Sequence, residues 1–347
     1  MISAPNFSKG FSTLLTGRAL ITLIFISLFV GCNDVHDNLQ TYKGSIMGTT
    51  YRVSLARSNL NIEHSDILAR LTHVNQEMST YLPTSSLSQL NNLRVGSWLN
   101  ISQGFLEVTK FAIDLCYLSE GAFDISVGQV VNAWGFGPIK VDTSPEDTFI
   151  NKRIKEIGCD AIEINSDENK VRRTREVYID LSALAKGYAI DVLANYLDSL
   201  KVDNYLIELG GELKAKGYKQ GRKPWIVGIE HPDLRSKPII TLSSDKFAFF
   251  SLATSGNYRN FKKFNNETVT HTFDPRNGST IVNNISSVSV ISDSTLKSDA
   301  LATTLNVMGL RKGLDFANLH GIQAIFISDR KDNFSIYPSN EVHTLLN

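Results

Sequence analysis

The chain has 347 residues, enough for one large or two ordinary domains that each bury a core. Apolar residues make up 42% and charged residues 20% of the chain, which is typical of a globular protein. Lys plus Arg and Asp plus Glu number 35 each, and no stripe of basic and aromatic residues is present, which argues against a nucleic-acid-binding protein.

The amino terminus has the pattern of an export signal. Two basic residues precede an apolar run from Ala19 to Val30, which is too short to span a bilayer and fits the hydrophobic region of a signal peptide. Gly31 and Cys32 follow directly, as in the lipobox of bacterial lipoproteins, where the cysteine is acylated and becomes the mature N-terminus. We predict a signal peptide over residues 1–31 and a lipid-anchored tether over residues 32–43; a plain secretory signal is the alternative.

In the first half of the chain, alternation predicts strands and helical spacing predicts helices. The strand covers Ser45–Leu55, and the helices cover Ile62–Met78, Phe105–Ser119 and Ile150–Ile157. Tyr81 lies in a loop, where it could stack on a planar ligand or be an ordinary surface aromatic.

Two further cysteines, Cys116 and Cys159, complete the set of three. A disulfide between them is chemically allowed outside the cytoplasm, while the apolar helical pattern around Cys116 fits a buried free thiol at least as well. No CxxC pair is present, so a zinc ribbon or a thioredoxin-type site is unsupported.

The segment from Gly121 to Pro138 is rich in glycine and contains a Trp, two Phe and a single acidic residue, Asp124. Glycines let the backbone approach a ligand closely, so this composition suits a binding loop. A connection that packs its own aromatic residues is the other interpretation.

The segment from Tyr178 to Leu197 changes from strand-like alternation to a helical face that begins at Ala183. Ser182 stands where an N-cap would stand, and a helix start after a strand favours a phosphate. Lys186 in the first turn adds a positive charge, and Asp180 adds a carboxylate just outside the helix. The alternative is an ordinary strand-to-helix corner with a solvated lysine.

The second half of the chain alternates short strands with one more important helix. Asp299 and Thr303 lie one turn apart on that helix, Ser298–Leu310, which Gly309 ends. Their hard oxygen atoms are ligands that Mg²⁺ prefers, although a carboxylate favoured by the helix dipole is the simpler interpretation. The predicted strands cover Asn204–Leu209, Trp225–Glu230, Ile239–Leu242, Ile285–Ile291 and Ala324–Ser328. Phe247–Thr254 is an apolar run, and Thr270–Phe273 has the pattern of a strand end.

No dinucleotide, P-loop, zincin or hydrolase signature is present. Strands and helices are interleaved without a steady βα rhythm, which predicts an α+β fold. Taken together, the segments resemble the ApbE family, the FAD:protein FMN transferases, over about residues 44–320. The resemblance is carried in order by Met47-Gly48-Thr49, Met78-Ser79-Thr80-Tyr81, Gly121-Ala122-Phe123-Asp124, Trp134-Gly135-Phe136-Gly137-Pro138, Asp180-Leu181-Ser182 with Lys186-Gly187-Tyr188, Glu208-Leu209-Gly210-Gly211, Ala253-Thr254-Ser255-Gly256, His271 with Asp274-Pro275 and Gly278, and Ser298-Asp299-Ala300 with Thr303.

The resemblance implies a single ApbE-like α+β domain over residues 44–347, with mixed sheets and helices and a flavin cleft. It implies an enzyme that binds FAD and Mg²⁺. A Thr or Ser hydroxyl of a partner protein would attack the phosphate of the FMN half, so that AMP leaves and FMN stays attached as a phosphoester. The expected partners are exported or membrane-bound redox subunits with a D-x-x-[ST]-G-A-[TS]-like motif.

The resemblance also implies roles for individual residues. The metal ligands would be Asp299, Thr303 and the carbonyl of Ala183; some members carry a further Asp at the place of Ala302. His271 would accept the proton of the incoming hydroxyl, unless it is a structural histidine bonded to the following turn. The flavin-contacting positions would be Met47, Tyr81, Ala122, Phe123, Asp124, Asp180, Lys186 and Phe273.

Two other functions remain open on this evidence. A Mg²⁺-dependent FAD pyrophosphatase would use water in place of the protein hydroxyl, and a non-catalytic lipoprotein would bind FAD and leave it intact. Under each of them we expect the protein in the bacterial cell envelope, lipid-anchored and facing the periplasm, at the inner membrane.

Overall fold

The computed structural model describes residues 39–56, 61–141, 143–233, 237–248, 250–256, 261–264, 267–281, 285–330 and 333–346. The predicted signal peptide and Cys32 lie outside these residues. Leu39 to Lys43, assigned to the tether from sequence, are part of the first strand, β1 (Leu39–Ile46), so the folded part begins before residue 44. Among the described residues, no helix has the length and apolar character needed to cross a bilayer.

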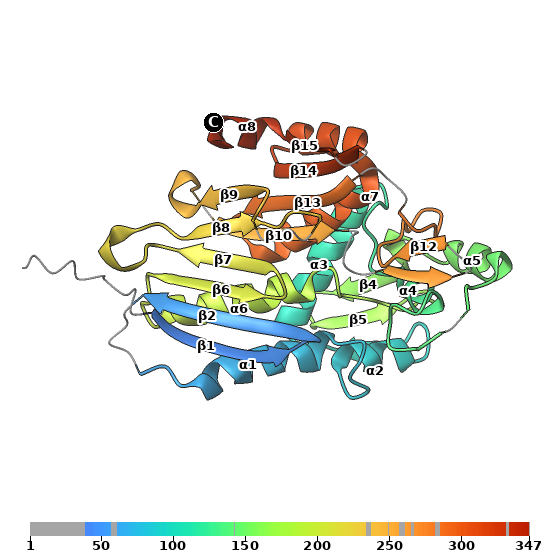
Figure 1. The fold of residues 1–347 in the computed structure, drawn as a ribbon. Coiled ribbons are helices and arrows are strands. Elements are labelled where there is room, and N and C mark those ends of the chain that lie inside the picture. Colours follow the sequence, from blue (N-terminus) through green and yellow to red (C-terminus); the bar gives the residue numbers. More distant parts are fainter. Residues whose placement is uncertain are drawn as a thin grey trace, which may run out of the picture. The chain divides into compact units, whose positions relative to one another are not determined.

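The main sheet has eight strands in the order β1-β2-β6-β7-β10-β13-β14-β15, and every neighbouring pair is antiparallel (Figure 1). β1 and β15 lie at its two edges. The remaining strands of this sheet are β2 (Thr49–Ala56), β6 (Tyr205–Leu209), β7 (Glu212–Lys216), β10 (Phe250–Gly256), β13 (Ile285–Ser292), β14 (Gln323–Arg330) and β15 (Asn333–Pro338).

Helices pack on one face of this sheet and bury most of the core. Val53 of β2 and Ile207 of β6 lie in one apolar cluster with Leu71 and Leu193, and all four side chains are fully buried. Burying a leucine-sized side chain contributes about 1.5–3 kcal/mol each, so this layer provides much of the stability. The helices that contribute are α1 (His64–Met78), α2 (Ser86–Asn92), α3 (Gln103–Leu118), α6 (Ala185–Ser199) and, over β13 and β14, α7 (Thr295–Leu319).

The opposite face of the sheet packs against a hairpin and a short helix. Trp225, Val227 and Leu242 come from the hairpin side, and Val342 comes from the helix α8 (Asn340–Leu346). They lie in one cluster with Ile291, Ile325 and Ile327 of the sheet. The hairpin strands are β8 (Ile226–Ile229) and β9 (Ile240–Ser243).

A smaller group of elements follows at one end of the main sheet (Figure 1). It contains a three-stranded sheet of order β3-β5-β4 and a two-stranded sheet of β11 and β12. The members are β3 (Leu99–Asn100), β4 (Ile162–Asn165), β5 (Lys170–Arg173), β11 (Phe261–Phe264), β12 (Glu267–Thr270), α4 (Gly128–Ala133) and α5 (Asp147–Ile154). Short 3-10 turns cover Cys159–Ala161, Gln220–Arg222 and Ser244–Lys246.

Several predicted boundaries differ from the structure. The strand predicted over Ser45–Leu55 is two strands joined by a two-residue turn, because Met47 and Gly48 have φ of 52° and 72°, which reverses the chain. The strand end predicted before α6 makes an isolated bridge at Tyr178 and is otherwise irregular. Gly309 breaks α7 as predicted, with φ of 79°, but a further helical stretch follows it.

Candidate active site

The two helices α6 and α7 cross in close contact at Gly187. A Cβ atom at this position would lie 2.4 Å from the Thr295 carbonyl oxygen and 2.9 Å from the Asp299 Cβ. Real Cβ atoms do not approach backbone this closely, so only glycine allows the two helices to lie together here. The crossing therefore brings the first turn of α6 against Asp299.

Gly187→Ala is expected to lower the free energy of unfolding by about 1–2 kcal/mol, because overpacking costs about 1–3 kcal/mol and helix propensity returns less than about 1 kcal/mol. Urea unfolding measures this as a lower midpoint at constant m-value. Asn195→Ala, on the exposed face of α6, is the control and should change little. Wild-type stability in Gly187→Ala would contradict the crossing.

A buried charge cluster lies at this crossing. Lys186 Nζ is 3.1 Å from Glu212 Oε1 and 3.9 Å from Asp299 Oδ2, with the lysine side chain 27% exposed and both carboxylates 8% exposed. Lys186 is thus not the solvated lysine of the simpler interpretation. Glu212 was not among the site residues predicted from sequence. It is the first residue of β7 and follows Gly210 and Gly211, which both have positive φ.

Burial and mutual charge set the protonation of this cluster. Burial raises the pKa of Asp299 to about 7, although the Lys186 ammonium opposes the shift. Burial also raises the pKa of Glu212, again opposed by Lys186. Burial alone would lower the pKa of Lys186, but Asp299 and Glu212 outweigh it and raise that pKa. The lysine therefore stays charged, and the two buried carboxyl groups share its single positive charge.

The first turn of α6 leaves oxygen atoms free for a cation. Its N-cap is Leu184, without a side-chain cap, so the predicted capping role of Ser182 is wrong; the Ser182 hydroxyl donates to Asp180. The Gly187 amide donates to Asp299 Oδ2 at 3.1 Å instead of to the carbonyl four residues earlier. Within the described residues, the Ala183 carbonyl oxygen accepts no backbone hydrogen bond, and Glu212 Oε2 is buried without a partner.

These oxygen atoms fit a hard divalent cation. Asp299 offers a carboxylate, Ala183 a carbonyl and Thr303 a half-buried hydroxyl one turn along α7. All are neutral or anionic oxygen donors, the set that Mg²⁺ prefers. The structure thus brings Asp299 to the start of α6, and Thr303 follows on the same side of α7.

Asp191 fixes the angle between the two helices. Its carboxylate accepts from the Thr295 and Leu296 amides at 3.0 and 2.9 Å and from the Ser294 hydroxyl at 2.8 Å. Lys214 forms an ion pair with it at 2.9 Å. A carboxylate on α6 thereby caps the N-terminus of α7, an interaction that sequence spacing could not have indicated.

An extended segment leads into α6 and carries Asp180. Asn91 holds it by donating to the Ile179 carbonyl at 2.9 Å and accepting from the Ile179 amide at 2.7 Å. Arg173 is buried and donates to three backbone carbonyls, including that of Val177 at 2.8 Å. On this side of the segment, hydrogen bonds from side chains therefore take the place of those from a neighbouring strand.

Asn91→Ala is expected to lower the free energy of unfolding by about 1–3 kcal/mol, because both polar groups of the Ile179 backbone lose their partner. Thermal or urea unfolding tests this against Asn92→Ala, an exposed neighbour on the same helix. Equal stability of the two variants would show that the asparagine does not hold the segment.

A second segment runs beside the first. The Asp180 amide donates to the Ile125 carbonyl at 2.8 Å, and the Gly128 amide donates to the Tyr178 carbonyl at 3.0 Å. A Cβ at Gly128 would lie 2.5 Å from that carbonyl oxygen, so the glycine permits the approach. The predicted flavin-contacting residues Ala122, Phe123 and Asp124 are buried and directly precede Ile125 in this segment.

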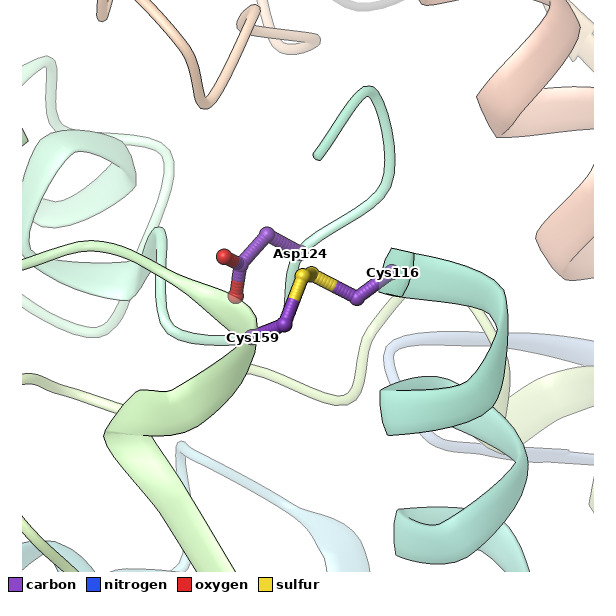
Figure 2. Close-up of side chains that lie close together, drawn as sticks. All are labelled: Cys116, Asp124 and Cys159. Atoms are coloured by element: carbon purple, nitrogen blue, oxygen red, sulfur yellow. A yellow bond between two sulfur atoms is a disulfide. The ribbon is translucent and has the colours of Figure 1, made fainter. Parts of the chain in front are cut away.

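Asp124 lies beside a disulfide between Cys116 and Cys159, so the buried free thiol suggested by the sequence pattern is wrong (Figure 2). Its Oδ1 accepts from the Ser126 amide and hydroxyl at 2.8 and 2.7 Å. Burial raises the pKa of Asp124, against those two hydrogen bonds and the charge of Arg175. Both sulfurs are used by the disulfide, so this cluster offers no thiolate to a metal.

Aromatic residues gather on the far side of the glycine-rich segment. Trp134 stacks on Phe273 with ring centroids 6.0 Å apart, and Phe136 lies 5.9 Å from Phe273 and 6.4 Å from His271. Tyr81 is 61% exposed and donates its hydroxyl to the Phe136 carbonyl at 3.0 Å. The structure thus joins Tyr81, His271 and Phe273 in one cluster.

Met47 lies in the β1–β2 turn with positive φ, a strained conformation for a methionine, and packs against the main core cluster.

A cavity of about 380 Å³ lies between Asp274, residues 279–281 and residues 307–309. Val307 follows Thr303 by one turn of α7, so the cavity lies beyond the predicted metal ligands on that helix.

The family model described as the ApbE family matches residues 47–326. The chain belongs to the ApbE family. The curated relatives include a FAD:protein FMN transferase of Vibrio cholerae, 35% identical over 94% of this chain and 98% of that protein. Another, from Haemophilus influenzae, is 35% identical over 90% of this chain and 93% of its own length.

Solved structures of the ApbE family agree in fold. A histidine-to-glycine mutant of the flavin transferase ApbE from Vibrio cholerae has a TM-score of 0.80 at 34% identity, covering 89% of this chain and 99% of its own. The apo flavinyl transferase ApbE of Pseudomonas stutzeri has a TM-score of 0.80 at 31% identity, covering 89% and 96%. The predicted ApbE membership and the single α+β fold are confirmed, and the predicted enzyme class agrees with the names of these relatives.

Proposed function

We propose that this protein is a Mg²⁺-dependent FAD:protein FMN transferase. The observation that carries the proposal is the α6–α7 crossing, where Asp299 takes the Gly187 amide and leaves the Ala183 carbonyl without an intrahelical partner. Such a set of buried oxygen atoms at a helix N-terminus suits a cation and the phosphates it neutralises. The family membership supports the same activity.

In this mechanism Asp299, Thr303 and the Ala183 carbonyl would hold Mg²⁺, which would neutralise charge on the FAD pyrophosphate when bound. Lys186 remains protonated beside Glu212 and adds positive charge at the same helix start. Phosphoryl transfer needs positioning and charge neutralisation more than covalent assistance from the protein. The crossing supplies both, and Asp191 on α6 holds the N-terminus of α7 beside it.

The aromatic cluster and the adjoining segments would hold the flavin half. Tyr81 offers an exposed ring face for stacking, and Phe273, Asp124, Asp180 and Met47 would contact the remainder. His271 would take the proton from the Thr or Ser hydroxyl of the acceptor as its oxygen attacks the FMN phosphate. The bond to the AMP phosphate breaks, AMP leaves, and FMN remains as a phosphoester.

The family resemblance supports a class of acceptor, and the amino-terminal sequence pattern supports a cellular address. We propose exported or membrane-bound redox subunits with a D-x-x-[ST]-G-A-[TS]-like motif as acceptors. Acylation at Cys32 would anchor the protein in the bacterial cell envelope, facing the periplasm, at the inner membrane. Metabolic labelling with a palmitate analogue tests this: label lost in Cys32→Ser supports the anchor, and label retained contradicts it.

The decisive experiment incubates the protein with FAD, Mg²⁺ and an acceptor protein and measures intact mass. An added mass equal to FMN on the acceptor, with release of AMP, supports the transferase. Free FMN and AMP formed equally fast without acceptor would instead establish a pyrophosphatase. FAD that stays bound and intact over hours with Mg²⁺ would establish a binding protein without chemistry.

A further inference from the structure

The disulfide between Cys116 and Cys159 closes the stretch of chain that carries much of the proposed flavin site. The two cysteines are 43 residues apart in sequence. Between them lie Ala122, Phe123 and Asp124, and also the aromatic residues Trp134 and Phe136. One covalent link thus joins both ends of this stretch, at the last turn of α3 and at the 3-10 turn before β4.

A short hydrogen-bond chain connects the disulfide to Asp124. The amide of Gly158, the residue before Cys159, donates to the Ser126 hydroxyl oxygen at 3.2 Å. That hydroxyl donates to Asp124 Oδ1 at 2.7 Å. Ser126 is fully buried and Asp124 is 7% exposed, so water does not readily replace either bond. Figure 2 shows the Asp124 carboxylate beside the disulfide, and one of its oxygens and both sulfurs lie within 4.8 Å of one another.

Other hydrogen bonds hold the backbone of this segment, among them the bond from the Gly128 amide to the Tyr178 carbonyl at 3.0 Å. The Phe123 amide donates to the Ser119 hydroxyl at 3.1 Å, and the Ile125 carbonyl accepts from the Asp180 amide at 2.8 Å. Neither contacts the Asp124 side chain. The orientation of that carboxylate therefore depends on Ser126. The Ser126 hydroxyl in turn accepts from the Gly158 amide, which the disulfide holds through the neighbouring Cys159.

We propose that the Cys116–Cys159 disulfide is a redox-sensitive clamp that positions Asp124, so that its reduction weakens the hold of the protein on FAD. This inference rests on the proposed function, because it takes Asp124 as a flavin contact. Ser126 and Gly158 are positioning residues in it. The cation ligands on α6 and α7 lie on other elements and stay as they are in the reduced state.

The reductant is a dithiol, and the step is balanced as ordinary thiol–disulfide exchange. Cys159 is partly exposed and Cys116 is 2% exposed, so a thiolate of the dithiol attacks the Cys159 sulfur. The S–S bond breaks and Cys116 leaves as a thiolate that takes up a proton. The second thiol of the reductant then displaces Cys159 as a thiol. The dithiol becomes a disulfide and two electrons pass to the protein.

The first test compares the oxidised protein with the same protein reduced by dithiothreitol. Amide hydrogen exchange should accelerate in residues 121–128 and remain unchanged at the α6–α7 crossing. The dissociation constant for FAD should rise about tenfold, within the range of about 5- to 150-fold usual for coupled sites, and should return on reoxidation. Unchanged exchange in residues 121–128 overturns the clamp, whatever the affinity for FAD.

Variants separate the clamp from general loosening. Cys116→Ser combined with Cys159→Ser should match the reduced protein, and Ser126→Ala should bind FAD weakly in both redox states. If reduction lowers the FAD affinity of Ser126→Ala by the same factor as that of the wild type, the effect does not pass through Ser126 and the proposal fails. Glu163→Gln, which removes an exposed ion pair on β4, is the control and should keep the full redox response.

The same measurements keep the two proposals apart. Oxidised protein that binds no FAD overturns the proposed function and, with it, the flavin part of this inference. Oxidised protein that binds and transfers FMN, with an affinity indifferent to reduction, overturns only the clamp. Circular dichroism of the reduced protein should show unchanged secondary structure; global unfolding on reduction would also overturn a clamp confined to residues 121–128.

Discussion

Asp299→Asn is expected to lower the rate of FMN transfer by about a thousandfold. A bound cation is worth several kcal/mol of charge stabilisation in such reactions, and each 1.36 kcal/mol is a factor of ten in rate. The asparagine can still accept the Gly187 amide but removes the negative charge that a cation needs. The fold should therefore persist while Mg²⁺ dependence is lost. Transfer is measured as FMN-sized mass on the acceptor at increasing Mg²⁺.

The control for this prediction is Asp293→Asn, the same chemical change at an exposed carboxylate that pairs with Lys297 at the start of α7. It should leave both turnover and Mg²⁺ binding within a factor of two or so of wild type, because surface ion pairs contribute little. Calorimetric titration with Mg²⁺ alone adds a readout that does not depend on turnover. Asp299→Asn that binds Mg²⁺ as tightly as wild type would remove Asp299 from the metal site.

His271→Ala is expected to lower the transfer rate by about 10²–10⁴-fold, the usual contribution of a general base. The histidine lies in the aromatic cluster beside Phe136, so the substitution should leave Mg²⁺ binding intact and change FAD affinity little. The rate of transfer at saturating FAD and Mg²⁺ is the measurement, with the two dissociation constants measured beside it.

His73→Ala is the matched control, since His73 is 67% exposed on α1 and pairs only loosely with Glu77. Its transfer rate should equal that of the wild type. If His271→Ala retains full turnover at neutral pH, the histidine has the structural role that the sequence also allowed, bonded to the turn that follows it.

The sequence predicts well those features that depend on local pattern. The helical faces over Ile62–Met78 and Phe105–Ser119 match α1 and α3 to within a few residues, because their apolar spacing is set by the core they bury. The break at Gly309 was also visible, since glycine readily takes positive φ. The metal ligands and flavin contacts came from resemblance, and they stay predictions as individual roles.

Interactions between distant residues could not be read from the pattern. Ser182 looked like an N-cap, yet the carboxylate at the start of α6 comes from Asp299 on another helix. Asp191 caps α7 from the middle of α6, and Asn91 takes the place of a strand beside Ile179. Glu212 directly follows two glycines in the sequence, but only the geometry of the hairpin brings its carboxylate to Lys186. In each case a side chain bonds to a backbone group or pairs with a charge that lies far away in the sequence, so the local pattern does not specify the partner.

The order of strands in the main sheet has a consequence for how the chain folds. β2 pairs with β6, and Tyr51 lies opposite Leu209. The chain between these two residues contains α1 to α6 and the three-stranded sheet, so all of it must be synthesised before they can pair. Contacts between such remote residues form slowly. Until then the amino-terminal hairpin keeps an open edge and an apolar face, on which other chains can pair. The β1–β2 hairpin of a newly synthesised chain is thus open to aggregation until residues 205–209 pair with β2.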